Sequence, residues 1–257
     1  MTRAFKSVMW IALLGIAVSA SAAYGQAPPP RAPVVRDLAS ELACAPTAVE
    51  ALPSRALHVV GGQVAGRTLF GPGDGLVVNG GASLGLMAGQ LYFVRRVVSD
   101  PFRRWGRHGV HRHQIHTAGW IRIDDVHADA AVATVTHACD AVMPGDYLEP
   151  FGLPAMPPDT APGQVDFAAP GRLIFGDEWR ELGGVGSYMV LDRGAVHGVH
   201  PGQHVTIFRP AGPAGRQAGV IRVGEATAML VGAETTTVRV DKSADAIYVG
   251  DLGAINR

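Results

Sequence analysis

The chain has 257 residues, with 22 Lys and Arg against 22 Asp and Glu; 47% of its residues are hydrophobic and 17% are charged. This balance gives no general attraction to nucleic acids or acidic lipids, so no nucleic-acid partner is expected. The hydrophobic fraction can build a folded core, and 33 glycines indicate many tight turns.

The N-terminus has the pattern of a secretory signal peptide. Arg3 and Lys6 precede an apolar run that ends in small residues near Ala22 and Ala23. We therefore predict a signal peptide over residues 1–23 and a protein that is periplasmic or secreted, with no stable membrane span after cleavage. An uncleaved N-terminal anchor is the alternative.

A Pro-rich lead-in with one short helix is expected over residues 24–55. Val35, Leu38 and Leu42 recur at helical spacing, which predicts a helix over residues 35–43. No other part of the sequence after the signal peptide gives a comparable helical pattern.

The two cysteines, Cys44 and Cys139, predict a disulfide in an exported protein. Two buried thiols are the alternative, because sequence does not show whether the side chains meet. In the chain-entropy treatment, closing so long a loop contributes on the order of 4 to 5 kcal/mol.

From residue 56 onward, short alternating segments separated by turns predict an all-β fold. We expect two tandem small β-barrel or sandwich units from an internal duplication: unit 1 over residues 56–150, a Pro-rich linker over 151–164 and unit 2 over 165–257. The expected strands cover residues 57–64, 76–78, 91–98, 120–126, 131–136 and 147–149, then 173–175, 189–191, 205–208, 220–231, 235–240 and the C-terminal residues.

The duplication is visible as a repeated glycine element. GASLGLMAGQLYFVRR at residues 81–96 returns as GAVHGVHPGQHVTIFR at residues 194–209, an offset of 113. GRTLFG at residues 66–71 and GRLIFG at residues 171–176 match at an offset of 105, which implies eight extra residues in unit 2 before the glycine element.

The later repeat blocks return to an offset of 105, and Gly145-Asp146 matches Gly250-Asp251. An Asp at this position can accept hydrogen bonds from backbone N–H groups of a turn that leads into a strand. In the glycine element we expect positive φ angles or close backbone approach. Leu86 and Val199 are expected to plug the ends of the two units.

Residues 81–85 match the Gly-x-Ser-x-Gly pattern of serine hydrolases, with Ser83 at the nucleophile position. In those enzymes a helix follows the serine, whereas here an alternating strand follows. Val196 replaces Ser83 in the second copy, so the glycines are interpreted as a structural turn and no catalytic residue is assigned.

An Arg/His segment at residues 95–116 is the best candidate for a binding site. Unit 2 has the shorter and less charged residues 210–219 in its place, so the fold does not require the longer version. The candidate binding residues are Arg103, Arg104, Trp105, Arg107, His111, Arg112 and His113.

Three interpretations of the Arg/His segment remain open. His111 and His113, with His108 or His116, could bind a metal ion, although six nearby Arg side chains oppose a dication. The Arg side chains could bind anionic groups, with aromatic stacking on sugars or bases. The segment could also be a solvated basic hairpin without a ligand. We predict no metal and no cofactor.

The repeated pattern, Gly-x-x-x-Gly followed by Gly-Gln, an alternating strand, Arg and a later Gly-Asp, resembles small β-barrel units of bacterial envelope proteins. The resemblance is to the C-terminal domain of flagellar assembly protein T and to units that accompany LysM domains. It implies a non-catalytic binding or scaffolding role, with an anionic envelope polymer or an envelope protein as partner. The alternative is a hydrolase that acts on an envelope polymer through the Arg/His segment.

Overall fold

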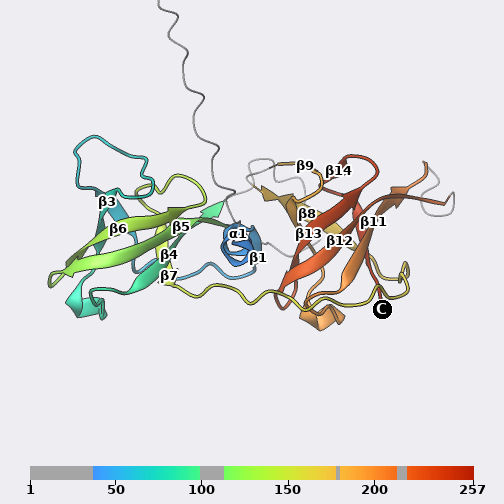
Figure 1. Ribbon diagram of the computed structural model, residues 1–257, viewed down its shortest axis with the longest axis horizontal. Helices are drawn as coiled ribbons and strands as arrows, with labels where there is room; N and C mark the ends of the chain where they lie inside the picture. The colour runs from blue at the N-terminus through green and yellow to red at the C-terminus, as the bar shows by residue number, and fades with distance from the viewer. Residues whose placement is uncertain (1–36, 99–112, 178–179, 213–218) are drawn as a thin grey trace, which may run out of the picture. The chain divides into compact units, whose positions relative to one another are not determined.

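The computed structural model describes residues 37–98, 113–177, 180–212 and 219–257 (Figure 1). Strands dominate this part of the chain, and the one α-helix in it is α1, Leu38–Cys44. The predicted all-β fold with one short helix is therefore confirmed. The predicted signal peptide, and the predicted helix start at residue 35, lie outside the described residues.

Unit 1 is built on one antiparallel sheet with the strand order β2-β3-β6-β5-β4-β7, in which β1 also pairs with β5. A backbone bridge between His58 and Tyr147 joins the two ends of this order. The strands are β1 (Thr47–Val49), β2 (Val59–Gly62), β3 (Gly75–Asn79), β4 (Leu91–Val98), β5 (His113–Val126), β6 (Ala130–Ala138) and β7 (Tyr147–Pro150).

Unit 2 forms a closed barrel in the order β10-β13-β12-β11-β15-β8, shown in yellow to red in Figure 1. A separate two-stranded ladder pairs β9 (Leu182–Gly183) with β14 (Ile247–Tyr248). The barrel strands are β8 (Gly171–Gly176), β10 (Tyr188–Leu191), β11 (His204–Pro210), β12 (Val220–Val231), β13 (Thr236–Ser243) and β15 (Leu252–Ile255).

The glycine element has the same conformation in both units. It begins with a short 3₁₀ helix, η1 (Ala82–Leu84) in unit 1 and η4 (Ala195–His197) in unit 2. A left-handed glycine with φ 78° ends each helix, Gly85 in unit 1 and Gly198 in unit 2. A side chain at either position would cost steric energy, because left-handed backbone brings Cβ close to the following carbonyl. The predicted need for positive φ is thus confirmed.

The glycine element also packs against the turn between the two long strands of its unit. In unit 1 the backbone N–H groups of Ala82 and Ser83 donate to carbonyls of residues 127 and 128, and in unit 2 Ala195 and Val196 donate to residues 232 and 233. A Cβ on Gly81 would collide with this turn. The glycine corner and the long-strand turn are therefore fitted to each other.

The core of each unit is closed by the residue after the left-handed glycine. Leu86 and Val199 are both almost fully buried, each within the apolar cluster of its own unit. Gln90 and Gln203 complete the corner, because each side chain accepts a hydrogen bond from the backbone N–H three residues earlier. The predicted plug role of Leu86 and Val199 is confirmed.

The predicted equivalence of residues 66–71 with residues 171–176 is wrong. Val59 pairs with Val78 in unit 1 as Leu173 pairs with Leu191 in unit 2, so β8 corresponds to β2. The six-residue match includes Arg67 with Arg172 and Phe70 with Phe175 as well as the glycines, but it does not correspond to a shared place in the sheet.

The eight-residue difference lies elsewhere. The segment between Arg96 and Gly119 in unit 1 is eight residues longer than the segment between Arg209 and Gly224 in unit 2. The two units therefore differ in length mainly in the β4–β5 hairpin and its unit 2 counterpart, the β11–β12 hairpin.

Helix α1 is short, so tertiary contacts must hold it. The Asp37 carboxylate caps its N-terminus by accepting hydrogen bonds from the Ala39 N–H and the Ser40 hydroxyl. Leu42 and Ala43 are its buried residues. The helix runs one residue beyond the predicted end and finishes at Cys44.

Candidate functional site

Most of the binding residues predicted from sequence lie outside the described residues. This applies to Arg103, Arg104, Trp105, Arg107, His111 and Arg112. His113 is the first residue of β5, where its backbone pairs with Val49 of β1.

Both ends of the Arg/His segment lie in strands, of which the first was predicted and the second was not. Residues 95–98 belong to β4 and residues 113–116 to β5, with Arg96 opposite His116 and Val98 opposite Gln114. Gln114 and His116 are buried although their polarity suggested a loop. The part of the segment outside the two strands is therefore residues 99–112, which we call the hairpin tip.

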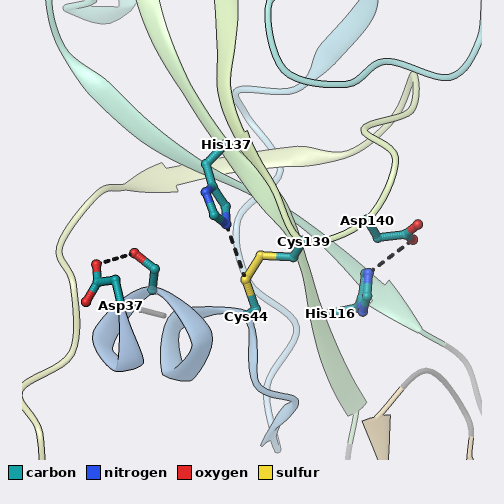
Figure 2. Close-up of a disulfide and its surroundings, with 7 residues drawn as sticks. Asp37, Cys44, His116, His137, Cys139 and Asp140 are labelled. Carbon is teal, nitrogen blue, oxygen red and sulfur yellow. Dashed lines mark hydrogen bonds and ion pairs between the residues drawn. A yellow bond between two sulfur atoms is a disulfide. The ribbon is translucent and has the colours of Figure 1, made fainter. Parts of the chain in front are cut away.

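His116 belongs to an ionic network of unit 1. Its Nε2 atom lies 3.3 Å from a carboxylate oxygen of Asp140, as Figure 2 shows, and the Arg96 guanidinium lies 3.6 Å from the same carboxylate. Arg96 also lies 3.0 Å from Asp146. His116, considered above as a metal ligand, thus has an anionic partner in the folded protein.

Asp146 has a structural role in this network. Its buried carboxylate accepts a hydrogen bond from the Met143 backbone N–H and one from Arg96. Burial raises the pKa of Asp146 above the usual carboxyl value, and these two hydrogen bonds oppose the rise. The carboxylate therefore holds a turn and pairs with Arg96 at the same time.

Unit 2 has the same network at equivalent positions. Arg209 lies 2.8 Å from Asp251 and 3.3 Å from Asp245, and Asp251 accepts a hydrogen bond from the Tyr248 backbone N–H. The role predicted for the repeated Gly-Asp pair, a turn held by the Asp side chain, is confirmed. Because both units keep the Arg and both Asp residues, this network belongs to the repeat itself.

Ser83 lies in η1, on the surface of unit 1. Its hydroxyl donates a hydrogen bond to Asp129, with 3.1 Å between the oxygens. Strand β4 follows the glycine element, so the strand-to-helix turn typical of a Gly-x-Ser-x-Gly nucleophile is not formed in this described segment.

The predicted disulfide is present between Cys44, the last residue of α1, and Cys139, directly after β6 (Figure 2). Their Cα atoms are 5.6 Å apart, a usual separation for a disulfide. The bond attaches α1 to unit 1 across a sequence separation of 95 residues.

His137 lies beside this disulfide, and the sequence analysis did not identify it. Its Nε2 atom is 4.0 Å from Cys44 Sγ, and Figure 2 shows the ring pointing toward this sulfur. The imidazole also stacks on Trp120, with ring centroids 3.9 Å apart and planes 6° apart. The available signal was the His-x-Cys spacing, which places two side chains on the same face of an extended chain.

His137 is part of an aromatic row, which we define as Phe93, Trp120, His137 and Phe151. Phe93 pairs with Trp120, and Trp120 with His137, across three neighbouring strands. Phe151 follows β7 and packs against Phe93 and Trp120. Ala43 of α1 lies in the same apolar cluster. The helix therefore covers a sheet face that would otherwise expose aromatic rings to water.

Asp37 adds a negative charge near the row. The hydrogen bond from Ser40 holds the pKa of Asp37 below the usual carboxyl value, and the charge of His137 acts in the same direction. The carboxylate is therefore favoured at the N-terminus of α1, where it also complements the helix dipole.

Comparison with models of protein families finds no match, and no curated protein matches the sequence either. Within the described residues, no helix is long and apolar enough to cross a membrane.

Proposed function

We propose that the protein is a non-catalytic binding or scaffolding module of the bacterial cell envelope, with an anionic envelope polymer or an envelope protein as its partner. The proposal rests on the segment in which the two units differ. They share the glycine corner and the Arg/Asp network, whereas the hairpin tip is longer in unit 1 and rich in Arg and His. The repeated charged residues thus serve the fold, and the proposed role of the added ones is to bind a partner.

The expected compartment agrees with the cysteine chemistry. A disulfide between Cys44 and Cys139 persists in oxidising compartments and is rare in the cytoplasm. Together with the signal peptide predicted from residues 1–23, it supports a periplasmic or secreted protein.

The composition of the hairpin tip favours an anionic partner. Arg103, Arg104, Arg107 and Arg112 carry planar guanidinium groups that suit phosphate and carboxylate, and Phe102 and Trp105 offer faces for stacking. His108 and His111 would add positive charge below about pH 6.5. Binding to an anionic polymer should therefore strengthen as the pH falls toward 6.

The test is a capture experiment from envelope extract with a chimera that keeps both strands. Arg96 lies opposite His116 in unit 1, and Arg209 lies opposite Ile221 in unit 2, so these two pairs occupy equivalent positions. The chimera therefore replaces residues 99–112 with residues 212–217. We expect the wild type to retain an anionic polymer or a protein, and the chimera to lose it. Equal capture by both proteins would contradict binding through the tip.

A matched control keeps the charge of the tip and removes the guanidinium shape. Changing Arg103, Arg104, Arg107 and Arg112 to Lys should weaken capture less than the chimera does, but measurably. Release of soluble fragments from the polymer by the wild type, lost in Ser83→Ala or His111→Ala, would overturn the proposal in favour of a hydrolase.

A further inference from the structure

We infer that Cys44, Cys139 and His137 form a site with two states: a disulfide under oxidising conditions and, after reduction, a Zn²⁺ site made of two thiolates and one imidazole nitrogen. Within the described residues these three are the one group of three or more His, Cys, Asp or Glu side chains whose ligand atoms all lie close enough to share an ion.

The distances suit zinc once the sulfur–sulfur bond is broken. The three ligand atoms lie within 4.8 Å of one another, and His137 Nε2 is 4.0 Å from Cys44 Sγ. With Zn–S near 2.3 Å and Zn–N near 2.0–2.1 Å, tetrahedral geometry separates ligand atoms by roughly 3.5–3.8 Å. Only small side-chain movements are needed, and water would complete the coordination.

The backbone holds both cysteines in place without the disulfide. Thr47, three residues after Cys44, begins β1, which pairs with β5 from Thr47 opposite Ile115. The Cys139 N–H donates a hydrogen bond to the Ala118 carbonyl, 2.9 Å away. Reduction therefore leaves two thiols that stay close together, as a preformed metal site requires.

The imidazole is also positioned in advance. Stacking on Trp120 fixes the plane of the His137 ring, and the cross-strand pairing of the two residues fixes its place on the sheet. All three ligand residues are half-buried, so a reductant and an ion can reach them. Nitrogen and thiolate ligands of this kind favour Zn²⁺ over Mg²⁺ or Ca²⁺.

The chemistry balances with a dithiol as reductant. The dithiol gives two electrons and two protons to the sulfur–sulfur bond and becomes a cyclic disulfide, which leaves Cys44 and Cys139 as thiols. Zn²⁺ then displaces both thiol protons, because thiolates are the metal ligands. Oxidation by a disulfide reverses the sequence and releases the ion.

The fold of the repeat does not require these residues. Unit 2 has Lys242 opposite Glu225 where unit 1 has His137 opposite Trp120. By the same offset Ala244 takes the place of Cys139. The group is present in unit 1 alone, which favours a specific role over a packing role.

The test uses Co²⁺ as a spectroscopic probe for zinc. The full-length protein is reduced with dithiothreitol, freed of reductant without oxygen and titrated with Co²⁺. Because the chain has four Trp residues, the near-UV circular dichroism of Trp120 is taken as the difference between wild type and Trp120→Phe, and it reports whether Trp120 remains packed. We expect one equivalent to give thiolate-to-cobalt charge-transfer absorption, Zn²⁺ to remove it, and the oxidised protein to give none. No such absorption in reduced wild type, or loss of its Trp signal on reduction, would overturn the inference.

Two variants and a control test the ligands individually. His137→Gln keeps the disulfide for folding, and should weaken Co²⁺ binding by more than the roughly 10–100-fold typical of outer-shell changes. Cys139→Ala, which installs the unit 2 residue, should abolish the charge-transfer band. The control is His127→Gln, at a histidine whose side chain is 65% exposed, and it should change neither the Co²⁺ affinity nor the charge-transfer band. Equal affinity of His137→Gln and wild type would remove His137 from the site and overturn the inference.

Discussion

Units 1 and 2 place opposite chemistry on the same sheet face. In unit 1 the cross-strand row is aromatic and lies under α1. In unit 2 the equivalent residues are polar: Lys242 pairs with Glu225 at 2.7 Å, and Thr206 donates to Asn256. The row residues of unit 1 and their unit 2 equivalents are Phe93 and Thr206, Trp120 and Glu225, His137 and Lys242, and Phe151 and Asn256.

The difference separates what both copies of the repeat have from what only one copy has. Both copies have an apolar core, the glycine corner and the partly buried Arg/Asp network. The opposite sheet face differs between the copies, and in unit 1 it lies against α1. Three stability experiments distinguish the shared features from those found in one copy.

Loss of the disulfide should have the largest effect. Reduction, or Cys44→Ser with Cys139→Ser, should lower the free energy of unfolding by about 4 to 5 kcal/mol, because the unfolded chain regains the entropy of a long loop. Urea denaturation measures the loss, and amide hydrogen exchange assigns it. Faster exchange in β6 but not in β11 would fit the comparison, whereas equal acceleration in both would contradict it.

Trp120→Ala should have the next largest effect. It removes the centre of the aromatic row under α1, and we expect a loss of about 3 to 4 kcal/mol, within the usual range for such truncations. Glu225→Ala is the matched change in unit 2. It breaks an ion pair whose Lys242 side chain is 75% exposed, so it should leave the urea midpoint almost unchanged. Similar losses in the two variants would break the comparison.

Asp146→Ala and Asp251→Ala should have equal effects, because they break the same network in the two units. Each change leaves an Arg without its main partner, and we expect the free energy of unfolding to fall by about 3 kcal/mol. This is the low end of the range for buried pairs, because 20% of the Arg96 side chain and 27% of the Arg209 side chain remain exposed. The Asn variants, which keep the turn hydrogen bond, should lose less in urea denaturation. A loss confined to one unit would show that the network is not shared.

The sequence predicted the parts of the fold that depend on local conformation. Glycines at fixed spacing required left-handed turns, and Gly85 and Gly198 have them. The alternating pattern of residues 91–98 predicted β4 with its correct bounds. The disulfide followed from the number of cysteines and the expected export, although only the structure shows that Cys44 and Cys139 meet.

The errors arose where tertiary contacts override local pattern. Gln114 and His116 look like loop residues, but pairing with β1 and β4 draws them into a strand. Residues 66–71 match residues 171–176 at Gly, Arg and Phe positions, yet the two segments do not occupy equivalent places in their units. His137 was missed because Trp120 and Cys44 come from a distant strand and from α1, and the His-x-Cys spacing alone does not show that they lie beside it. The predicted binding residues of the hairpin tip remain predictions.

The fit between the glycine corner and the long-strand turn restricts where this repeat can vary. An added residue in the turn at 127–130 would displace the carbonyls that Ala82 and Ser83 bind, and the equivalent turn of unit 2 is held in the same way. The β4–β5 hairpin and the β11–β12 hairpin, by contrast, differ in length by eight residues. Each unit thus has a fixed framework and one hairpin that tolerates a change in length, so natural or engineered insertions are expected to accumulate in that hairpin.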